Sequence, residues 1–482
     1  MLNYKIILRT IGFLLIGESL FMLFPLLISV IYEGTDTSAF IYSSIITFFA
    51  GATFLSFTYK AKKQVGKREG YIIVSIVWIF FSFFGSLPFI ISQSIPSYHD
   101  AFFETMSGFT TTGASILNNI EELPHGILFW RSLTQWLGGM GIVVLSLAIL
   151  PAFGIGGMTL FSAEAPGVTT EKINPKIKDT ARILWNVYLV FTLIEMFLLM
   201  FGGMNFFDAI NHSLTTMATG GYSTKQASIA YWDSPYIQYV ITFFMILAGT
   251  NFSLSYFAIA GKPGKMFRNE EFKFYIFIIL LSSTLLTIGL MLTSNLGIEK
   301  SFRNAIFQVV SIVTTTGFAT DDYLMWAPVL TAIIFLLFFI GGSTGSTGGG
   351  IKVMRIVLLL KNSYYELRRL VHPNAVIPVR YNKKSVNQQI ITNVLAFFFF
   401  YVAVFVFSCL FMMLFVNDFE TAMGAVASSL GNIGPGLGAV GPVENYAFLH
   451  PVAKWFLSFL MLLGRLELFT IIVILSPAFW KR

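Results

Sequence analysis

TTTGAS, at residues 110–115, is the first of four short glycine-containing loops on which the fold depends. The others read ATGGYS from Ala218, TTTGFAT from Thr314 and LGNIGPG from Leu430. None of the four loops contains an acidic residue, and each ends a segment that starts with an aromatic side chain. Similar loops that recur along one chain indicate a duplicated structural unit.

The four segments share several columns of residues in register. Alanine stands twelve residues before the loop glycine, and a hydroxyl residue stands six before it. The segments are Tyr98 to Gly113, Phe206 to Gly221, Phe302 to Gly317 and Phe419 to Gly434; the alanines are Ala101, Ala209, Ala305 and Ala422; the hydroxyl residues are Ser107, Thr215, Ser311 and Ser428. Columns that match without gaps in four copies predict one unit repeated four times.

The composition places the chain in a membrane. Hydrophobic residues make up 55% of the 482 residues and charged ones only 11%, so too few polar side chains remain to cover a water-soluble surface. Uncharged stretches long enough to cross about 30 Å of hydrocarbon recur from end to end. The ten predicted spans are residues 6–32, 38–59, 71–92, 127–151, 183–201, 236–260, 274–293, 326–340, 391–416 and 451–476. The single cysteine, Cys409, excludes a disulfide framework.

Each loop segment lies between two predicted spans and is too short to cross a bilayer by itself. The predicted fold is therefore an all-α polytopic membrane protein, with four span, pore-loop and span repeats around a pseudo-fourfold pore and two further transmembrane helices at the N-terminus. The expected divisions are 1–60 for the N-terminal helix pair, 70–160, 180–261, 272–360 and 386–482 for repeats one to four, and 361–385 for a basic cytoplasmic loop.

The net charge of +7 is unevenly distributed, and its distribution predicts the orientation of the chain. Basic residues cluster between Lys60 and Arg68 and between Lys352 and Lys384, and loops rich in lysine and arginine face the cytoplasm. The segments expected outside contain Asp100, Glu121, Glu122, Asp233, Asp321, Asp322 and Glu444. Nucleic-acid binding is a poor alternative, because the basic residues alternate with spans and lack interleaved aromatic side chains. The four glycine loops are then expected toward the outer face.

The glycine loops have the composition of a potassium filter. Non-helical backbone is tolerated at membrane depth where it lines a pore or a binding site. Potassium exchanges its hydration shell for rings of carbonyl and hydroxyl oxygens, and glycine permits the positive φ that lets successive carbonyls point toward one axis. The alternative is that the glycines form simple tight turns, but four copies in register favour a filter. The predicted K⁺ filter, with backbone carbonyls as ligands, comprises Thr110, Thr111, Thr112, Gly113, Thr219, Gly220, Gly221, Thr315, Thr316, Gly317, Asn432, Ile433 and Gly434.

A glycine-rich run follows the third repeat. The predicted span at 326–340 measures only about 22 Å at 1.5 Å per residue, so the helix is expected to end before it reaches the inner surface. Closely spaced glycines disfavour helix, and we expect a flexible gating loop beneath the filter. The alternatives are an ordinary cytoplasmic linker and a phosphate-binding loop, for which Lys352 lacks the required neighbours. The predicted gate residues of this loop are Gly341, Gly342, Ser343, Thr344, Gly345, Ser346, Thr347, Gly348, Gly349 and Gly350.

Arg465 is the second predicted element of the gate. It lies in the lower part of the last span, where an arginine costs about 3 kcal/mol unless it reaches water or a counter-charge. A pore cavity would supply that water, and the fixed charge would repel a passing cation. The alternative is a snorkelling arginine or an ion pair that ties helices together, and Glu467 faces away from Arg465 on a helix. For the intramembrane carboxylates of Glu18 and Glu195, structural pairing is favoured over proton coupling.

These features resemble the TrkH and KtrB family of bacterial potassium transporters. The resemblance covers essentially the whole chain and includes FWRSLTQWLGGMGI from Phe129 and GRLELF from Gly464; the N-terminal helix pair makes the chain more similar to TrkH. The resemblance implies potassium uptake across a bacterial cytoplasmic (inner) membrane, by a homodimer with one pore per protomer, driven largely by membrane potential and gated by a cytoplasmic nucleotide-binding ring of the TrkA type. The fourth loop departs from the pattern through Asn432, Ile433 and Pro435, which predicts a less symmetric ring.

Three other functions compete with a potassium pore. They are a Na⁺- or H⁺-coupled potassium symporter of the same architecture, a carrier for another solute, and a membrane enzyme. An enzyme would need clustered nucleophiles, acids or metal ligands. The five histidines lie in separate segments without such spacing: His99, His125, His212, His372 and His450. We therefore expect no catalytic residue and no covalently bound cofactor, with K⁺ as the transported ion and membrane lipid as the surroundings.

Overall fold

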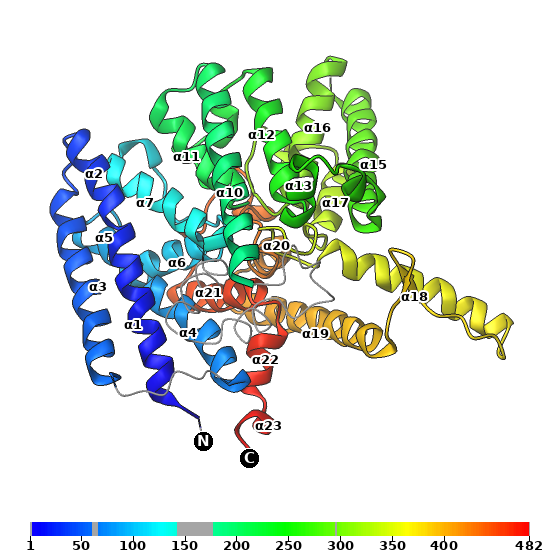
Figure 1. Ribbon diagram of the computed structural model, residues 1–482. Coiled ribbons are helices and arrows are strands. Elements are labelled where there is room, and N and C mark those ends of the chain that lie inside the picture. The colour runs from blue at the N-terminus through cyan, green and yellow to red at the C-terminus, as the bar shows by residue number, and fades with distance from the viewer. Residues whose placement is uncertain (1, 60–65, 142–176, 295, 482) are drawn as a thin grey trace.

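The computed structural model describes residues 2–59, 66–141, 177–294 and 296–481, which are largely helical (Figure 1). Within these ranges, the only strands are the two-residue β1 (Arg380–Tyr381) and β2 (Lys384–Ser385), which pair as a hairpin. The predicted all-α class is confirmed. Two predicted features lie outside the described residues: the basic residues Lys60, Lys62 and Lys63, and the second half of the span at 127–151 with the end of repeat one near residue 160.

Four short helices carry the loop segments. They are α6 (Tyr98–Phe109), α11 (Phe206–Met217), α16 (Ile298–Val313) and α20 (Phe419–Gly431). The first turns of these helices contain the carboxylates of Asp100, Asp208, Glu299 and Glu420, where the positive end of the helix dipole favours negative charge. Three of the helices begin at the predicted aromatic residue, and α16 begins one turn earlier than the predicted Phe302 because Gly297 is its N-cap.

Further helices flank these four in the order that the repeats require. Repeat one has α4 (Lys67–Gly85), α5 (Leu87–Ile91) and α7 (His125–Trp136); repeat two has α10 (Ile177–Phe201), α12 (Pro235–Ala248) and α13 (Phe252–Ile259). Repeat three has α15 (Glu270–Thr293), α17 (Pro328–Leu337) and α18 (Val353–Val371); repeat four has α19 (Gln388–Met412), α21 (Pro451–Arg465) and α22 (Phe469–Leu475). The remaining helices are α1 (Tyr4–Phe21), α2 (Leu23–Ile31), α3 (Thr37–Phe57), α14 (Gly264–Arg268) and α23 (Pro477–Trp480).

Six helices of the described residues are long and apolar enough to cross a membrane, or eight if each of two bent pairs counts as one span. The bent pairs correct the sequence prediction, which treated 236–260 and 451–476 as continuous spans. α12 meets α13 at 109°, and α21 meets α22 at 114°. Of the other two predicted spans, α17 is only 10 residues long and α7 leads into residues that are not described. In each of the last three repeats, the helix that follows the loop therefore ends or bends early.

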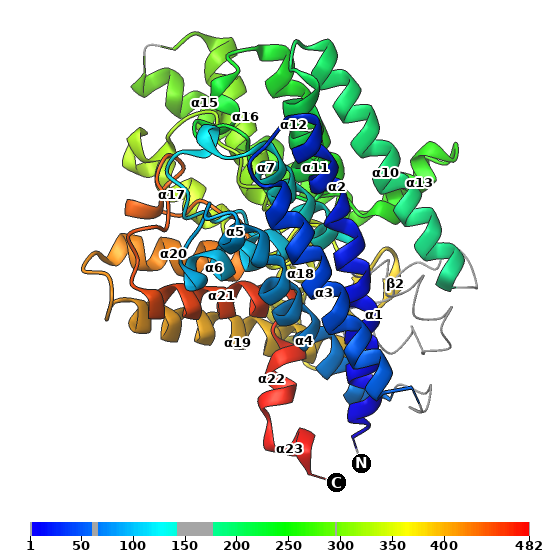
Figure 2. The same ribbon diagram turned by 90° about the vertical axis from the view of Figure 1, so that its left-hand side faces the viewer.

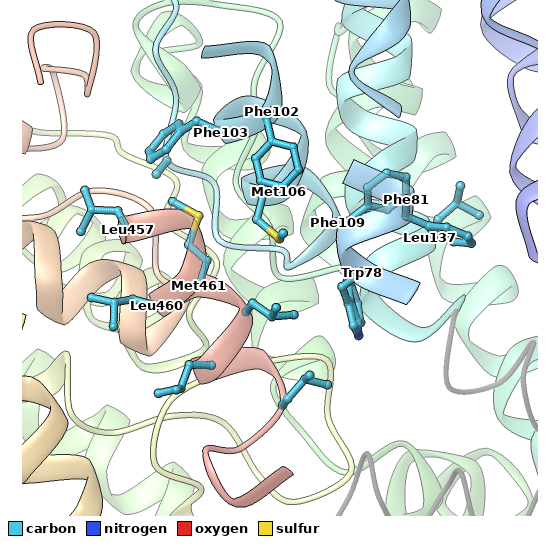
Figure 3. Packing of buried hydrophobic residues seen from close by; sticks show 14 of the residues in the cluster. Trp78, Phe81, Phe102, Phe103, Met106, Phe109, Leu137, Leu457, Leu460 and Met461 are labelled. Carbon is cyan, nitrogen blue, oxygen red and sulfur yellow. The ribbon is translucent and has the colours of Figure 1, made fainter. Parts of the chain in front are cut away.

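The repeats are arranged in a cycle. α7 of repeat one packs against α11 of repeat two, α12 of repeat two against α16 of repeat three, and α21 of repeat four against α6 of repeat one. Figure 3 shows the last of these contacts, where Met461 of α21 points toward Phe103 and Met106 of α6. Contacts that join the last repeat to the first close the bundle around a centre.

The N-terminal helix pair lies on one flank of this bundle (Figures 1 and 2). α1 packs along α3, with Gly12 against Gly51: a Cβ added to either glycine would lie 2.8 Å from the carbonyl oxygen of the other. Small residues at such crossings let membrane helices approach closely. The outer side of α3 exposes apolar side chains such as Phe49, and the outer side of α19 exposes Phe399. An apolar outer surface of this kind is suited to lipid.

The segment predicted as a basic loop at 361–385 begins as a helix. α18 continues to Val371 and carries the basic residues Arg368 and Arg369 in its last turn, where the negative end of the helix dipole stabilises positive charge. In Figure 1 this helix projects away from the bundle, and the β1–β2 hairpin follows it. The loop proper is therefore confined to the residues after α18.

Candidate functional site: a ring of four loops

The four glycine loops share one backbone conformation. The loop glycines have positive φ angles: +82° at Gly113, +78° at Gly221, +83° at Gly317 and +105° at Gly434. The residue two positions before each glycine is left-handed as well, with φ of 55° at Thr111, 53° at Thr219, 58° at Thr315 and 54° at Asn432. Left-handed backbone is costly for residues other than glycine and clusters at functional sites. Four equivalent occurrences show that this conformation is a property of the repeat.

The loops close a ring. A Cβ added to Gly113 would collide with the carbonyl oxygen of Gly220, one added to Gly221 with that of Thr316, and one added to Gly317 with that of Ile433. The fourth contact returns to the start, because a Cβ on Gly434 would lie 2.8 Å from the carbonyl oxygen of Thr112. Each loop glycine thus lies against the carbonyl that precedes the glycine of the next loop. All predicted filter residues lie in these four loops.

The hydroxyl column predicted from the sequence anchors the ring to its helices. The backbone carbonyls of Ser107, Thr215, Ser311 and Ser428 accept hydrogen bonds of 2.8–3.0 Å from the amides of Thr112, Gly220, Thr316 and Ile433, respectively. In repeats three and four the hydroxyl contributes directly: Ser311 Oγ donates to Phe318 O at 2.7 Å, and Ser428 Oγ donates to Gly434 O at 2.6 Å. The alanine column is fully buried in all four repeats. The backbone at this column thus holds every loop, whereas the hydroxyl itself holds the loop only in repeats three and four.

The fourth loop keeps the ring conformation with a different side chain. Asn432 has the same left-handed backbone as the threonines, and asparagine tolerates that conformation better than most residues. Its Nδ2 donates to Thr112 Oγ1 of the first loop and to Met461 O of α21, both at 2.9 Å. The predicted loss of symmetry lies mainly in the side chains, with a smaller backbone difference at Gly434, whose φ is +105°.

The surroundings of the ring favour a cation. Each loop follows the C-terminal end of its helix, where the helix dipole places partial negative charge. On one side, the four loop glycines line an open cavity together with Arg131, Lys225 and Glu444. When a cation that has entered this cavity reaches the ring, the oxygens that it meets there carry no net charge.

A buried ion pair that the sequence prediction missed supports loops one and two. Arg131 Nε of α7 lies 2.9 Å from Glu104 Oε1 of α6, and both side chains are at most 2% exposed. Arg131 also donates to Ser223 O at 3.2 Å and stacks on the ring of Tyr222, with its guanidinium carbon 4.1 Å from the ring centroid. Glu104 accepts the amide of Ile116 at 2.9 Å. The FWRSLTQW run contains this arginine, but nothing in the sequence identifies its partner.

The predicted gate loop lies directly against the opposite side of the ring. Gly349 N donates to Thr315 Oγ1 at 2.7 Å, and Thr347 Oγ1 donates to Met217 O at 3.0 Å. Further bonds fasten the loop to the break between α12 and α13: Ser343 N donates to Gly249 O at 2.8 Å, and Asn251 Nδ2 donates to Thr344 O at 2.6 Å. A Cβ on Gly348 would lie 2.8 Å from Thr314 O. The loop that was predicted to be flexible is thus closely packed in this structure.

Arg465 joins the gate loop to two repeats. Its Nη1 donates to Thr347 O at 2.7 Å, and its Nη2 donates to Gly138 O at 2.6 Å and to Gly139 O at 2.7 Å. Three carbonyls from two separate segments therefore converge on one guanidinium. Arg465 thus ties segments together through backbone carbonyls, and its gate role stays a prediction.

We expect the loss of the Arg465 bonds, or of the loop that they hold, to favour the open state. Arg465→Ala, or shortening of the 341–350 run, should raise ion flux into proteoliposomes by about tenfold without changing ion preference. A hydrogen bond to a charged group contributes about 1.5–3 kcal/mol, so the loss of one already shifts a gate equilibrium by about a factor of ten. Arg465→Lys is the control, because it keeps the charge but replaces the two guanidinium nitrogens that reach the two segments with a single ammonium nitrogen. Flux that stays at the wild-type level in Arg465→Ala and in the shortened loop would remove the gating role.

Three intramembrane carboxylates have different surroundings. Glu467 pairs with Arg355 of α18, so the prediction that Arg465 is not its obvious partner agrees with the structure. Glu18 and Glu195 are both buried, and neither forms an ion pair with a residue that the structure describes, so their structural pairing stays a prediction. An unpaired carboxylate in such surroundings is costly when ionised.

Known proteins match the chain along its whole length. A family profile described as "TrkH: Cation transport protein" matches residues 37–482. The chain belongs to the TrkH family. Two curated relatives named "Trk system potassium uptake protein TrkH", from Salmonella typhimurium and Escherichia coli K12, are each 41% identical over the full length of both proteins, across 484 and 487 aligned residues.

A solved structure shows the same fold. This TrkH-family chain superimposes on the crystal structure of the potassium transporter TrkH from Vibrio parahaemolyticus with a TM-score of 0.89, at 38% identity and with complete coverage of both chains. The resemblance stated from the loop residues, and the four-repeat membrane fold, are confirmed by these matches. The chain is accordingly an integral membrane protein of a cation transport family.

Proposed function

We propose that this TrkH-family chain takes up potassium through a gated pore, with the ring of four loops as its selectivity filter. The closed cycle of contacts between each loop glycine and the next loop's carbonyl carries the proposal, because it places equivalent carbonyls of Thr112, Gly220, Thr316 and Ile433 around one centre. The curated relatives that match over their full length are named as potassium uptake proteins. The function is transport, and we propose no catalytic residue.

The chemistry of the ring suits a weakly hydrated monovalent cation. Carbonyl dipoles replace the water shell of potassium at a modest energetic cost and release the ion again, whereas carboxylates would hold it. The carbonyl of Gly434 already accepts bonds from Ser428 Oγ and Tyr446 OH, at 2.6 and 2.8 Å. In loop four, the carbonyl of Ile433 is therefore a better candidate for ion contact than that of Gly434.

Flux measurements in proteoliposomes test this function. With potassium inside and sodium outside, the purified protein should give a reversal potential near the potassium equilibrium potential, with rubidium replacing potassium and N-methylglucamine carrying no current. A reversal potential that follows sodium would contradict the filter assignment. Opposing gradients of sodium or protons separate a gated pore from a coupled symporter, since only a symporter shifts its reversal potential with the second ion.

The same proposal covers assembly and orientation. The basic residues of α18 support a cytoplasmic position for this end of the chain in a bacterial inner membrane, with the cavity of the ring on the outer side. Below the ring, Arg465 and the 341–350 loop hold the closed state, and a nucleotide-binding subunit of the TrkA type acts on them from the cytoplasm of a homodimer. The mass of the purified protein, alone and with such a subunit, tests both associations: a monomer without affinity for the subunit would contradict them.

A further inference from the structure

The second loop of the ring lacks a threonine that two other loops have. Thr112 and Thr316 precede the glycines of loops one and three, and each bonds through its hydroxyl to the threonine two residues earlier, at 2.8 and 2.7 Å. The equivalent residue of loop two is Gly220, which has no side chain to fill the space behind the ring. Its φ angle is not positive, so its backbone does not require glycine.

Gln135 of α7 occupies this space. A Cβ added to Gly220 would collide with the side-chain amide of Gln135 and would lie 2.9 Å from its Cγ. The amide makes two bonds to the loop: Nε2 donates to Gly220 O at 2.6 Å, and Oε1 accepts the amide of Tyr222 at 3.1 Å. Gln135 is fully buried. A side chain from the preceding repeat thus replaces the missing threonine of loop two.

The bond to Gly220 O acts on the ring itself. This carbonyl is the one that faces Gly113 across the contact between loops one and two. In the described part of the chain, no side chain donates to the equivalent carbonyls of Thr112, Thr316 and Ile433. A carbonyl oxygen has two lone pairs, so Gly220 O can bind Gln135 and an ion together. Gln135 therefore fixes the position of one of the four ring carbonyls, that of Gly220, and the electrostatic field that this carbonyl presents to an ion.

We propose that Gln135 is a specificity-determining positioning residue of the filter, which holds the Gly220 carbonyl at the distance that favours potassium over sodium. This inference rests on the proposed function. It assigns the residue pair Gln135 and Gly220 as one complementary unit, in which the large side chain on α7 requires the absence of a side chain in loop two. The two residues should therefore be replaceable together but not separately.

The first test uses single variants. Gln135→Met keeps the volume of the side chain but cannot donate to Gly220 O or accept from Tyr222 N. We expect the potassium to sodium permeability ratio, from reversal potentials in proteoliposomes, to fall by about fivefold, the change that corresponds to one ordinary hydrogen bond. Gln238→Met is the matched control: Gln238 is a buried glutamine of α12 that bonds to Trp232 O and Arg303. It should leave the permeability ratio at the wild-type value.

The second test uses the pair. Gly220→Thr alone should lower potassium flux at least about tenfold, because its side chain collides with Gln135. Gln135→Ala removes the obstacle, so the double variant Gln135→Ala, Gly220→Thr should recover both the flux and the potassium to sodium ratio toward wild type. Equal elution volume and melting temperature of the purified variants separate this effect from misfolding. Additive losses in the double variant, or an unchanged potassium to sodium permeability ratio in Gln135→Met, would overturn the inference about Gln135. The proposed function would still hold as long as the wild type is selective for potassium. A wild type without potassium selectivity would overturn both.

Discussion

Bacteria that lack their own potassium uptake should fail to grow in low potassium when they express Gly317→Ser, although the wild-type chain supports their growth. At +83° the φ of Gly317 belongs to a region that costs other residues about 1–3 kcal/mol, and a Cβ there would collide with the carbonyl oxygen of Ile433. This free-energy cost alone corresponds to about a 10- to 100-fold smaller fraction of protein with a correctly formed ring. Rubidium uptake by the same cells measures the loss directly.

Gly297→Ser on the same helix is the control. Gly297 is the N-cap of α16, has a φ of −65°, and would have nothing within 4 Å of an added Cβ. Serine is a favourable N-cap residue, so growth should match the wild type. If Gly317→Ser grew as well as Gly297→Ser at every potassium concentration, the assignment of the ring as the filter would be wrong.

The second large effect is on stability. Arg131→Met should lower the melting temperature of the detergent-purified protein severely, because it leaves the Glu104 carboxylate buried without its charge partner. Breaking one side of a buried ion pair costs about 3–5 kcal/mol. Restoring charge balance with Glu104→Gln in the same chain should recover part of this loss, and a thermal unfolding curve followed by intrinsic tryptophan fluorescence measures it.

An exposed pair provides the comparison. Arg369 and Glu366 of α18 also form an ion pair, but their side chains are 25% and 54% exposed. Such pairs contribute about 0–1 kcal/mol, so Arg369→Met should leave the melting temperature nearly unchanged. Similar losses for Arg131→Met and Arg369→Met would show that the buried pair does not stabilise loops one and two.

The repeats could be predicted from the sequence because each loop has fixed requirements at fixed offsets. A glycine with positive φ, a hydroxyl residue six positions earlier and a buried alanine twelve earlier appear in every copy, and their spacing is independent of the rest of the chain. The early end of the second span was predicted for repeat three, but the bends within the second spans of repeats two and four could not be predicted. Hydropathy continues across both bends, and at the second bend the chain turns at Glu467 and Leu468, which have φ angles of 54° and 55° although neither is glycine.

The supporting residues of the site were harder to predict than the ring. Glu104 and Arg131 lie on different helices, and Gln135 bonds to a loop more than 80 positions away, so their roles depend on how the repeats pack. Arg465 was predicted from its unusual position in a span, but its three carbonyl partners come from α21's neighbours in space and not in sequence. Local patterns identify such a residue without identifying what it bonds to.

Because one polypeptide supplies all four loops, each quarter of the ring is encoded separately. In a pore built from four identical subunits, one codon change alters every quarter at once. Here Gly220 and Asn432 differ from their counterparts while the ring stays closed, because Gln135 bonds to the carbonyl of Gly220 and the carbonyl of Met461 accepts a bond from Asn432. A gene of this kind can acquire ion preference in small steps, one quarter at a time, with three quarters unchanged at every step.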